Sequence, residues 1–169
     1  GYQNHAIYVG NPEANSTLPA GIHYSLDDGQ TWQQSALQGV TAQLIQMAVH
    51  PIDANRVALA AEDGVWLSSE YGDSFARIGD EQTVTAVTFH PNGQSLLFGY
   101  HALSSYELAS QQSAELPSPI IAVEDAISYI AVNPVQPETI ALATFNKIVY
   151  LTHDGGKSWT PIVEAGKAQ

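Results

Sequence analysis

Three octets of one pattern constrain this chain more than any other feature. Each follows the form S/T-x-D/E-x-G-x-T/S-W/F, and they begin at Ser25, Ser68 and Thr152. The starts lie 43 and 84 residues apart, and because 84 is twice 42, a decayed fourth copy is expected between Leu108 and Ser113. Self-similarity at a fixed period of roughly 40 residues predicts a repeat architecture.

A second marker keeps the same period. Apolar segments end at His50-Pro51, His90-Pro91 and Asn133-Pro134, and each is followed by a polar turn and a run of strand-forming residues. One further apolar run leads into each octet, and another begins at its aromatic residue. Each unit of about 42 residues therefore holds four short strands and no convincing helix, which is the composition of a β-propeller blade.

These units predict an all-β chain, a β-propeller portion of four-stranded antiparallel blades. It forms a single domain over 1–169, with units at about 1–40, 41–80, 81–120 and 121–169. The first unit supplies only three strands, at Ala6–Gly10, Gly21–Ser25 and Thr31–Ala36, so its inner strand is missing. Because open sheet edges pair with other chains, we expect the missing propeller half or a second copy of the chain to complete a ring.

The octets are interpreted as hairpin turns. Side chains at their first and third positions accept bonds from nearby backbone N–H groups, and the glycine adopts a positive φ. The final aromatic residue is expected to pack between sheets, burying about 150–250 Å². Because the pattern recurs while an active site occurs once, a structural role is predicted for Ser25, Asp27, Gly29, Thr31, Trp32, Ser68, Glu70, Gly72, Ser74, Phe75, Thr152, Asp154, Gly156, Ser158 and Trp159.

The octets resemble Asp-boxes, also called bacterial neuraminidase repeats, which occur in sialidases, sortilin-type receptors and xyloglucanases. A wider resemblance is carried by His5–Val9, Gly21–Gly29, Thr83–Phe89 and Tyr129–Pro134. Together these segments are similar to the C-terminal half of exported bacterial propellers described as glycosyl-hydrolase-like. The resemblance implies an extracellular or cell-envelope location in a bacterium, and it implies no catalytic residues.

Charge and composition exclude several classes of function. The chain carries 17 acidic and 5 basic residues, a net charge of −12, which argues against nucleic acid and anionic membrane surfaces as partners. Without cysteine it has no disulfide or thiolate metal site. No histidine pair has ligand spacing and no cofactor motif occurs, so neither metal nor cofactor is predicted. His50, His90 and Asn133 share one repeat position and are predicted to hydrogen-bond within turns.

Two enzyme hypotheses can be weighed from the residues. A sialidase needs three clustered arginines, whereas this chain has only Arg56 and Arg77, which argues strongly against that activity. A glycosidase needs two carboxylates about 5–9.5 Å apart. Glu62 and Asp63 are the first catalytic candidates because they lie in a loop between second and third strands. The alternative is that both are ordinary solvated loop carboxylates.

Loops between second and third strands, and between units, share the face on which propellers usually bind ligands. The binding candidates on this face are Glu13, Tyr100, His101, Phe145 and Asn146. For Tyr100 and Phe145 the alternative is packing at strand ends. The favoured function is a non-catalytic binding or scaffold propeller of an exported bacterial protein that recognises a protein or a glycan. The alternative is part of a glycoside hydrolase-like enzyme whose catalytic carboxylates lie partly outside this chain.

Overall fold

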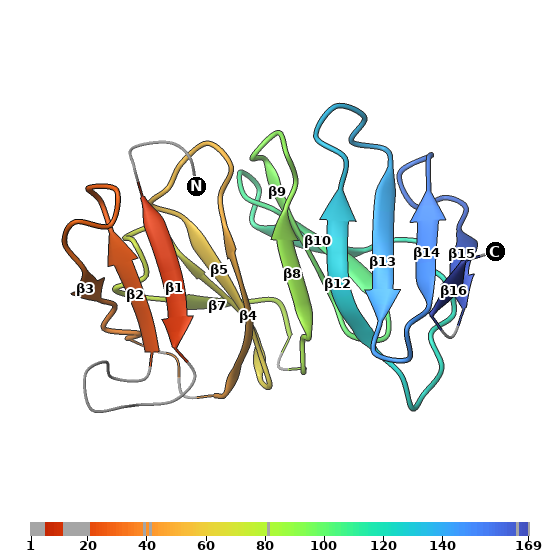
Figure 1. Ribbon diagram of the computed structural model, residues 1–169, viewed down its shortest axis with the longest axis horizontal. Helices are drawn as coiled ribbons and strands as arrows, with labels where there is room; N and C mark the ends of the chain where they lie inside the picture. Colours follow the sequence, from red (N-terminus) through yellow and green to blue (C-terminus); the bar gives the residue numbers. More distant parts are fainter. Residues whose placement is uncertain are drawn as a thin grey trace.

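Four β-sheets follow one another along the chain, as Figure 1 shows in the computed structural model. The structure describes residues 6–11, 21–38, 40, 42–80, 82–164 and 166–168, and this part of the chain contains no helix. It therefore offers no helical membrane span. In each sheet the strands are antiparallel and their spatial order follows the sequence, so every sheet is a meander of hairpins.

The strand bounds match the repeat units closely. The first sheet contains β1 (Ile7–Asn11), β2 (Gly21–Ser25) and β3 (Gln33–Gln34), and the second contains β4 (Leu44–Val49), β5 (Val57–Ala61), β6 (Gly64–Ser68) and β7 (Ala76–Ile78). The third contains β8 (Ala86–Phe89), β9 (Ser95–Gly99), β10 (Leu103–Glu107) and β11 (Gln112–Glu115). The fourth contains β12 (Ile127–Val132), β13 (Ile140–Thr144), β14 (Val149–Thr152), β15 (Thr160–Glu164) and β16 (Lys167–Ala168).

The all-β prediction is confirmed, with two differences in detail. The third strand of the first sheet spans two residues rather than the six of Thr31–Ala36, because the octet turn occupies its start. The fourth sheet has a fifth strand, the two-residue β16, in which Ala168 pairs with Val163 of β15. No apolar pattern in the sequence predicts this strand. Among the described residues the first sheet has three strands, as expected from its missing inner strand.

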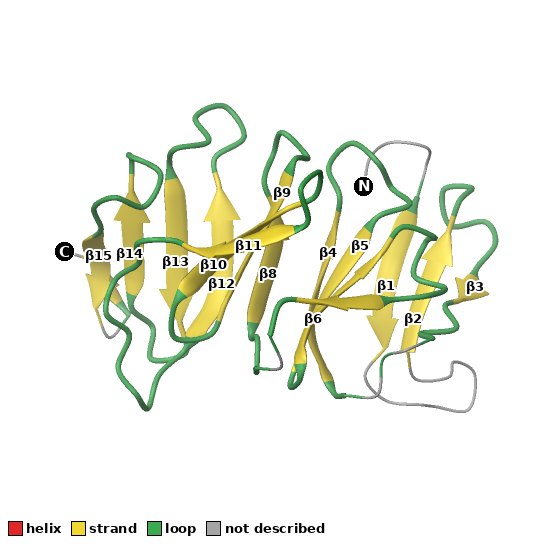
Figure 2. Ribbon diagram, turned by 180° about the vertical axis from the view of Figure 1, so that it is seen from behind, coloured by secondary structure: helices red, strands yellow, loops and turns green. Residues whose placement is uncertain are grey.

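Burial decreases from the second strand of each sheet to its outer edge. All five residues of β5 are buried, and β9 and β13 are mostly buried, which explains their near-continuous apolar runs. By contrast, every residue of β3 and β11 is exposed. Figure 2 shows β11 at the outside of its sheet. The sheets thus pack together most tightly around β5, β9 and β13, and the outer strands tolerate polar sequence.

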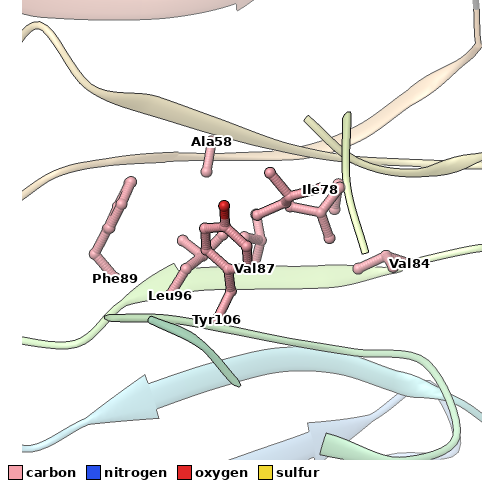
Figure 3. Close-up of a cluster of buried hydrophobic side chains, with 9 residues drawn as sticks. Ala58, Ile78, Val84, Val87, Phe89, Leu96 and Tyr106 are labelled. Atoms are coloured by element: carbon pink, nitrogen blue, oxygen red, sulfur yellow. The ribbon is translucent and has the colours of Figure 1, made fainter. Parts of the chain in front are cut away.

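Three apolar clusters lie between successive sheets. Ile22 packs with Leu59, Trp66 and Phe75 between the first and second sheets. Figure 3 shows the next cluster, in which Ala58 and Ile78 of the second sheet face residues of the third. The last cluster joins the third and fourth sheets; its buried members are Ala86, Leu97, Leu103, Ile127, Ile130, Ile140 and Leu142. Each sheet therefore buries its faces against its neighbours rather than in one central core.

Backbone hydrogen bonds reinforce each boundary between sheets. The N–H of Val84 donates to the carbonyl of Ala61 at 3.0 Å, and that of Ile127 donates to the carbonyl of Tyr100 at 2.7 Å. The buried hydroxyl of Thr85 lies 2.6 Å from the carbonyl of Ile127 and donates to it. Main-chain groups at sheet ends are paired across the boundary, where they would otherwise be costly to bury.

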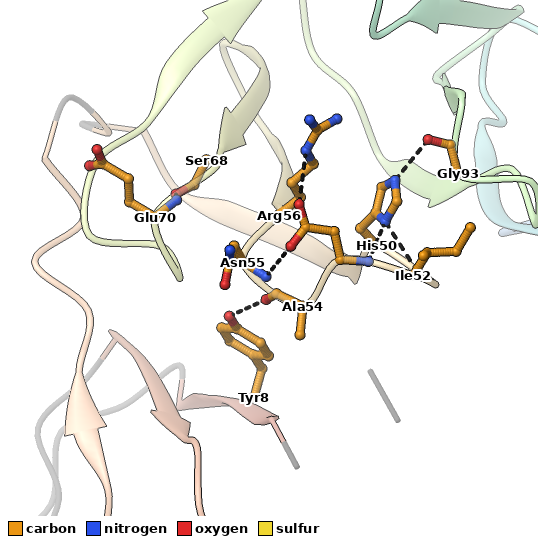
Figure 4. Close-up of polar contacts among 10 residues, drawn as sticks. Tyr8, His50, Ile52, Ala54, Asn55, Arg56, Ser68, Glu70 and Gly93 are labelled. Atoms are coloured by element: carbon orange, nitrogen blue, oxygen red, sulfur yellow. Dashed lines mark hydrogen bonds and ion pairs between the residues drawn. The ribbon is translucent and has the colours of Figure 1, made fainter. Parts of the chain in front are cut away.

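Side chains at the shared repeat position close the turns after the inner strands, and Figure 4 shows this for His50 after β4. Nδ1 of His50 accepts the N–H groups of Ile52 and Asp53 at 3.2 and 2.8 Å. Since Nδ1 is an acceptor, Nε2 carries the proton and donates to the carbonyl of Gly93 in the third sheet at 2.8 Å. In the fourth sheet the side-chain oxygen of Asn133 accepts two N–H groups in the same way.

Candidate functional site

The turns between second and third strands gather at one end of the molecule, at the bottom of Figure 1. They are the β5–β6 turn with Glu62 and Asp63, the β9–β10 turn with Tyr100 and His101, and the β13–β14 turn with Phe145 and Asn146. Phe145 is 59% exposed and Tyr100 is 38% exposed. For Phe145 the alternative of packing at a strand end is therefore wrong, because its turn projects beyond the sheet.

A groove of about 430 Å³ opens at this end, between the second and third sheets. It brings Tyr100 and His101 together with polar groups from three other segments, which are the connection after β7, strand β10 and the outer strand β11. The polar lining includes Asp80, Gln82, Thr83, Ser104, Ser113 and Glu115, and no lysine or arginine is among the described residues that line the groove. Sequence reasoning named the turn residues but not β11, because which outer strand borders a groove depends on how two sheets pack.

Tyr100 and His101 form an aromatic wall of this groove. Their ring centroids lie 4.1 Å apart with the planes tilted by 54°. Nδ1 of His101 is buried and has no hydrogen-bond partner, whereas buried polar atoms normally have one. The wall thus contributes two aromatic side chains to the groove lining, while Nδ1 of His101 lies beneath the surface.

The candidate catalytic pair is arranged differently. Oδ1 of Asp63 accepts the indole N–H of Trp66 at 2.9 Å, which holds this carboxylate against its own hairpin. The guanidinium of Arg77 lies over the same indole ring, 5.9 Å from its centroid. The side chain of Glu62 is exposed, and its backbone carbonyl accepts the hydroxyl of Thr83. Asp63 therefore has a positioning role in its turn, and Glu62 is the carboxylate turned to solvent.

A third carboxylate at this end, Asp125, lies in the loop before β12 but is only 5% exposed. Its Oδ1 accepts the N–H groups of Ala126 and Asn146 at 2.9 and 3.0 Å. Burial acts to raise the pKa of Asp125, but the hydrogen bonds from Thr144, Asn146 and Ala126 outweigh it and lower the pKa below its usual value. Asn146 thus presents its N–H to a structural carboxylate, and nothing in the sequence pattern distinguished Asp125 from its exposed neighbour Glu124.

The octets lie at the opposite end and form hydrogen-bonded turns. In the first, Oγ of Ser25 accepts the N–H of Gly29 at 2.8 Å, and Asp27 accepts both the N–H and the hydroxyl of Thr31. Thr152, Gly156, Asp154 and Ser158 repeat this arrangement in the last octet. In the second, Ser68 binds the N–H of Gly72, and Glu70 accepts the hydroxyl of Ser74.

The aromatic residues of the octets are buried unequally. Phe75 is 9% exposed in the cluster between the first two sheets, and Trp159 donates its indole N–H to the carbonyl of Pro117 in the connection that follows β11. Trp32 is 45% exposed and donates within its own turn to Gly29. The expectation of packing between sheets is therefore wrong for Trp32. The described residues contain no sheet that precedes the first one in sequence and could cover this side chain.

Stability should fall in acid through the octet carboxylates. The hydroxyl and N–H of Thr31 lower the pKa of Asp27 to about 2, and Ser158 and Thr152 likewise lower the pKa of Asp154. A carboxyl whose folded pKa lies below its unfolded value near 3.9 stabilises the fold above about pH 5 and loses this contribution as the pH falls towards 2. We expect Asp27→Asn to lower the melting temperature at pH 7, and the gap to wild type to close towards pH 2.

Thermal melting from pH 7 to pH 2 measures this gap. The matched control is Glu164→Gln, which removes one exposed negative charge from β15, away from the octets. A gap that stays constant with pH for Asp27→Asn would contradict the assignment.

Glu13, together with the rest of the insert over residues 12–20, lies outside the described residues. No group of three or more histidine, aspartate or glutamate side chains is arranged to hold a metal ion within the described ranges.

Neither a known protein family nor a curated protein sequence matches the chain. Solved structures do resemble it. An ancestral GH74 enzyme matches with a TM-score of 0.72 and 16% identity, over 93% of this chain and 22% of its own. The GH74 xyloglucanase from Xanthomonas campestris matches at 0.67 and 19%, over 94% and 28%. YCF48 bound to D1 peptide matches at 0.68 and 15%, over 95% and 50%.

These structures are β-propellers, and they match almost all of this chain. The fold is that of a β-propeller. The chain spans about a quarter of the GH74 enzymes and half of YCF48, so it corresponds to part of each. Its four sheets are the blades, and the groove lies between the second and third blades on the face that carries the turns between second and third strands.

Proposed function

We propose that the chain is a non-catalytic binding propeller portion of an exported bacterial protein, and that it binds a neutral glycan in the groove between the second and third blades. The supporting observation is the composition of that groove. Tyr100 offers an aromatic ring, and the described residues of the lining add hydroxyl, amide and carboxylate groups but no lysine or arginine. Sugar rings present apolar C–H faces and many hydroxyl groups, so they suit such a lining.

Charge supports a neutral ligand over an anionic one. The net charge of −12 repels anions, and Asp80 and Glu115 bring two carboxylates to the groove. A protein ligand is the other occupant considered at the sequence level, and YCF48 bound to D1 peptide gives it a structural precedent. We further propose that the octets are Asp-boxes and that the four units are those of 1–40, 41–80, 81–120 and 121–169.

Binding of xyloglucan oligosaccharides, followed by isothermal titration calorimetry, tests the proposal. We expect measurable binding that Tyr100→Ala weakens about tenfold or more, because a well-placed aromatic contact contributes more than 1 kcal/mol. The matched control is Val135→Ala, which truncates a residue that is 85% exposed in the turn after β12, at the other end of the fold. Equal affinity in wild type and Tyr100→Ala would exclude the groove, and binding of peptides alone would favour a protein ligand.

The hydrolase alternative is tested with the same oligosaccharides. Its supporting observation is the exposed carboxylate of Glu62 on the groove side of the propeller. We expect no release of reducing ends. Hydrolysis that Glu62→Gln or Asp63→Asn abolishes would overturn the non-catalytic proposal.

A further inference from the structure

The inner edge of β1 differs from the same edge in the other blades. The first octet residue pairs with Ile7 in the first blade, with Val57 in the second and with Ile140 in the fourth, so β1 corresponds to β5 and β13. On their other edges β5 pairs with β4, and β13 pairs with β12. Within the described ranges, β1 pairs on one edge only, with β2.

A groove of about 510 Å³ lies where the inner strand of the first blade would be. Gly10 and Asn11 of β1 form one side, and β4 forms the other; Ile22, Leu44, Ile45, Met47 and Leu59 give it a largely apolar lining. The corresponding space between β5 and the third blade is filled by β4, which pairs with β5 and contacts β8. Ile45 of β4 is left 41% exposed.

The chain itself shows what sequence suits this position. The inner strands β4 and β12 read LIQMAV and ISYIAV, and each runs directly into His-Pro or Asn-Pro. In β4, the small Ala48 packs against the cluster between the second and third blades. Oε1 of Gln46 accepts the N–H of Val87 in the next inner strand at 2.7 Å. By repeat position, Met47 is the residue of β4 that corresponds to Val87, and it lines the groove.

A second copy of the described residues has no strand to donate. Its inner strands β4, β8 and β12 are each paired within their own sheets, and β16 has only two residues. We propose that the groove beside β1 binds an extended segment of a partner polypeptide with the inner-strand sequence type, which adds to the first blade antiparallel to β1. Backbone bonds to the strand edge supply affinity, and alternate apolar side chains in the groove supply specificity. The proposal is independent of the glycan site.

A peptide with the sequence of Ala42–Pro51, AQLIQMAVHP, tests this site on the whole chain. At a peptide concentration about 100 times its Kd, we expect the melting temperature to rise by roughly 5–10 °C. Amide hydrogen exchange should slow in β1 on peptide binding. A peptide with proline in place of Gln46 and Ala48 should bind at least tenfold more weakly, because it lacks two backbone N–H donors.

Gly10→Leu is the blocking variant. A Cβ at Gly10 meets no atom within 4 Å, and Gly10 lines the groove, so a leucine should fill it without disturbing the sheet. We expect this variant to retain its β-type circular dichroism and lose peptide binding, while Val135→Leu, in the turn after β12, binds normally. Binding that Gly10→Leu leaves unchanged would overturn the location. Absence of binding by a monomer would overturn the proposal, as would a dimer whose β1 is already protected without peptide.

Discussion

Replacing Leu142 with alanine should lower the free energy of unfolding by about 2–5 kcal/mol. Leu142 is fully buried in β13 and packs with Leu97 of the third blade and Ile130 of its own. Removing its three terminal carbons loses burial and leaves a cavity that two rigid sheets cannot easily close. Because domains of this size are stable by about 5–15 kcal/mol, the variant would lose a large share of its stability. Urea unfolding followed by tryptophan fluorescence measures the loss.

The controls separate packing from hydrophobicity. Ile120→Ala removes a similar side chain that is 95% exposed, and we expect a change within about 0.5 kcal/mol. Leu142→Met keeps the volume and should lose less than about 1.5 kcal/mol. Similar losses for Leu142→Ala and Ile120→Ala would mean that the third and fourth blades do not pack as described.

Gly99→Ala should also destabilise the protein, by about 1–3 kcal/mol, although it adds only one methyl group. A Cβ at Gly99 would lie 2.6 Å from the carbonyl oxygen of Ala102 and 2.8 Å from Cδ1 of Ile127. Gly99 cannot easily move away from this carbonyl. It pairs with both Leu103 and Ala86, and its own carbonyl accepts the N–H of Thr85. Chemical denaturation of purified variants measures the effect.

Gly10→Ala is the matched control for this substitution. Gly10 also lies in a strand with an ordinary φ, but its Cβ position is open, so we expect little change. Combining Gly99→Ala with Ile127→Val should cost less than the sum of the two single variants, because the valine lacks the methyl group nearest to the new Cβ. Strict additivity would show that only the carbonyl of Ala102 opposes the substitution.

Most of the fold could be predicted from the sequence because the repeat signals recur. The His-Pro and Asn-Pro markers located the inner strands, and the position of Ala6–Gly10 predicted the three strands that the first blade has among the described residues. β16 was missed because Lys167 and Ala168 carry no apolar alternation. The exposure of Trp32 was missed because the packing of an octet aromatic residue depends on whether a neighbouring sheet is present.

The candidate site could be predicted only in part. The turns with Glu62, Tyr100 and Phe145 were identified because they occupy one position of the repeat. Their chemical environments depend on the side chains around them in three dimensions. Asp125 reads as a loop carboxylate, yet it is buried under backbone donors, and Ser113 and Glu115 come to the groove from an outer strand with no distinctive pattern.

The main-chain bonds at the blade boundaries also bear on ring geometry. Val84 to Ala61 and Ile127 to Tyr100 join equivalent positions of successive repeats without using any side chain. The angular step from one blade to the next is therefore fixed in part by groups that every sequence shares. Core side chains can then diverge between repeats, as Ala58 and Leu97 do at one strand position, while the curvature that closes a circle is preserved.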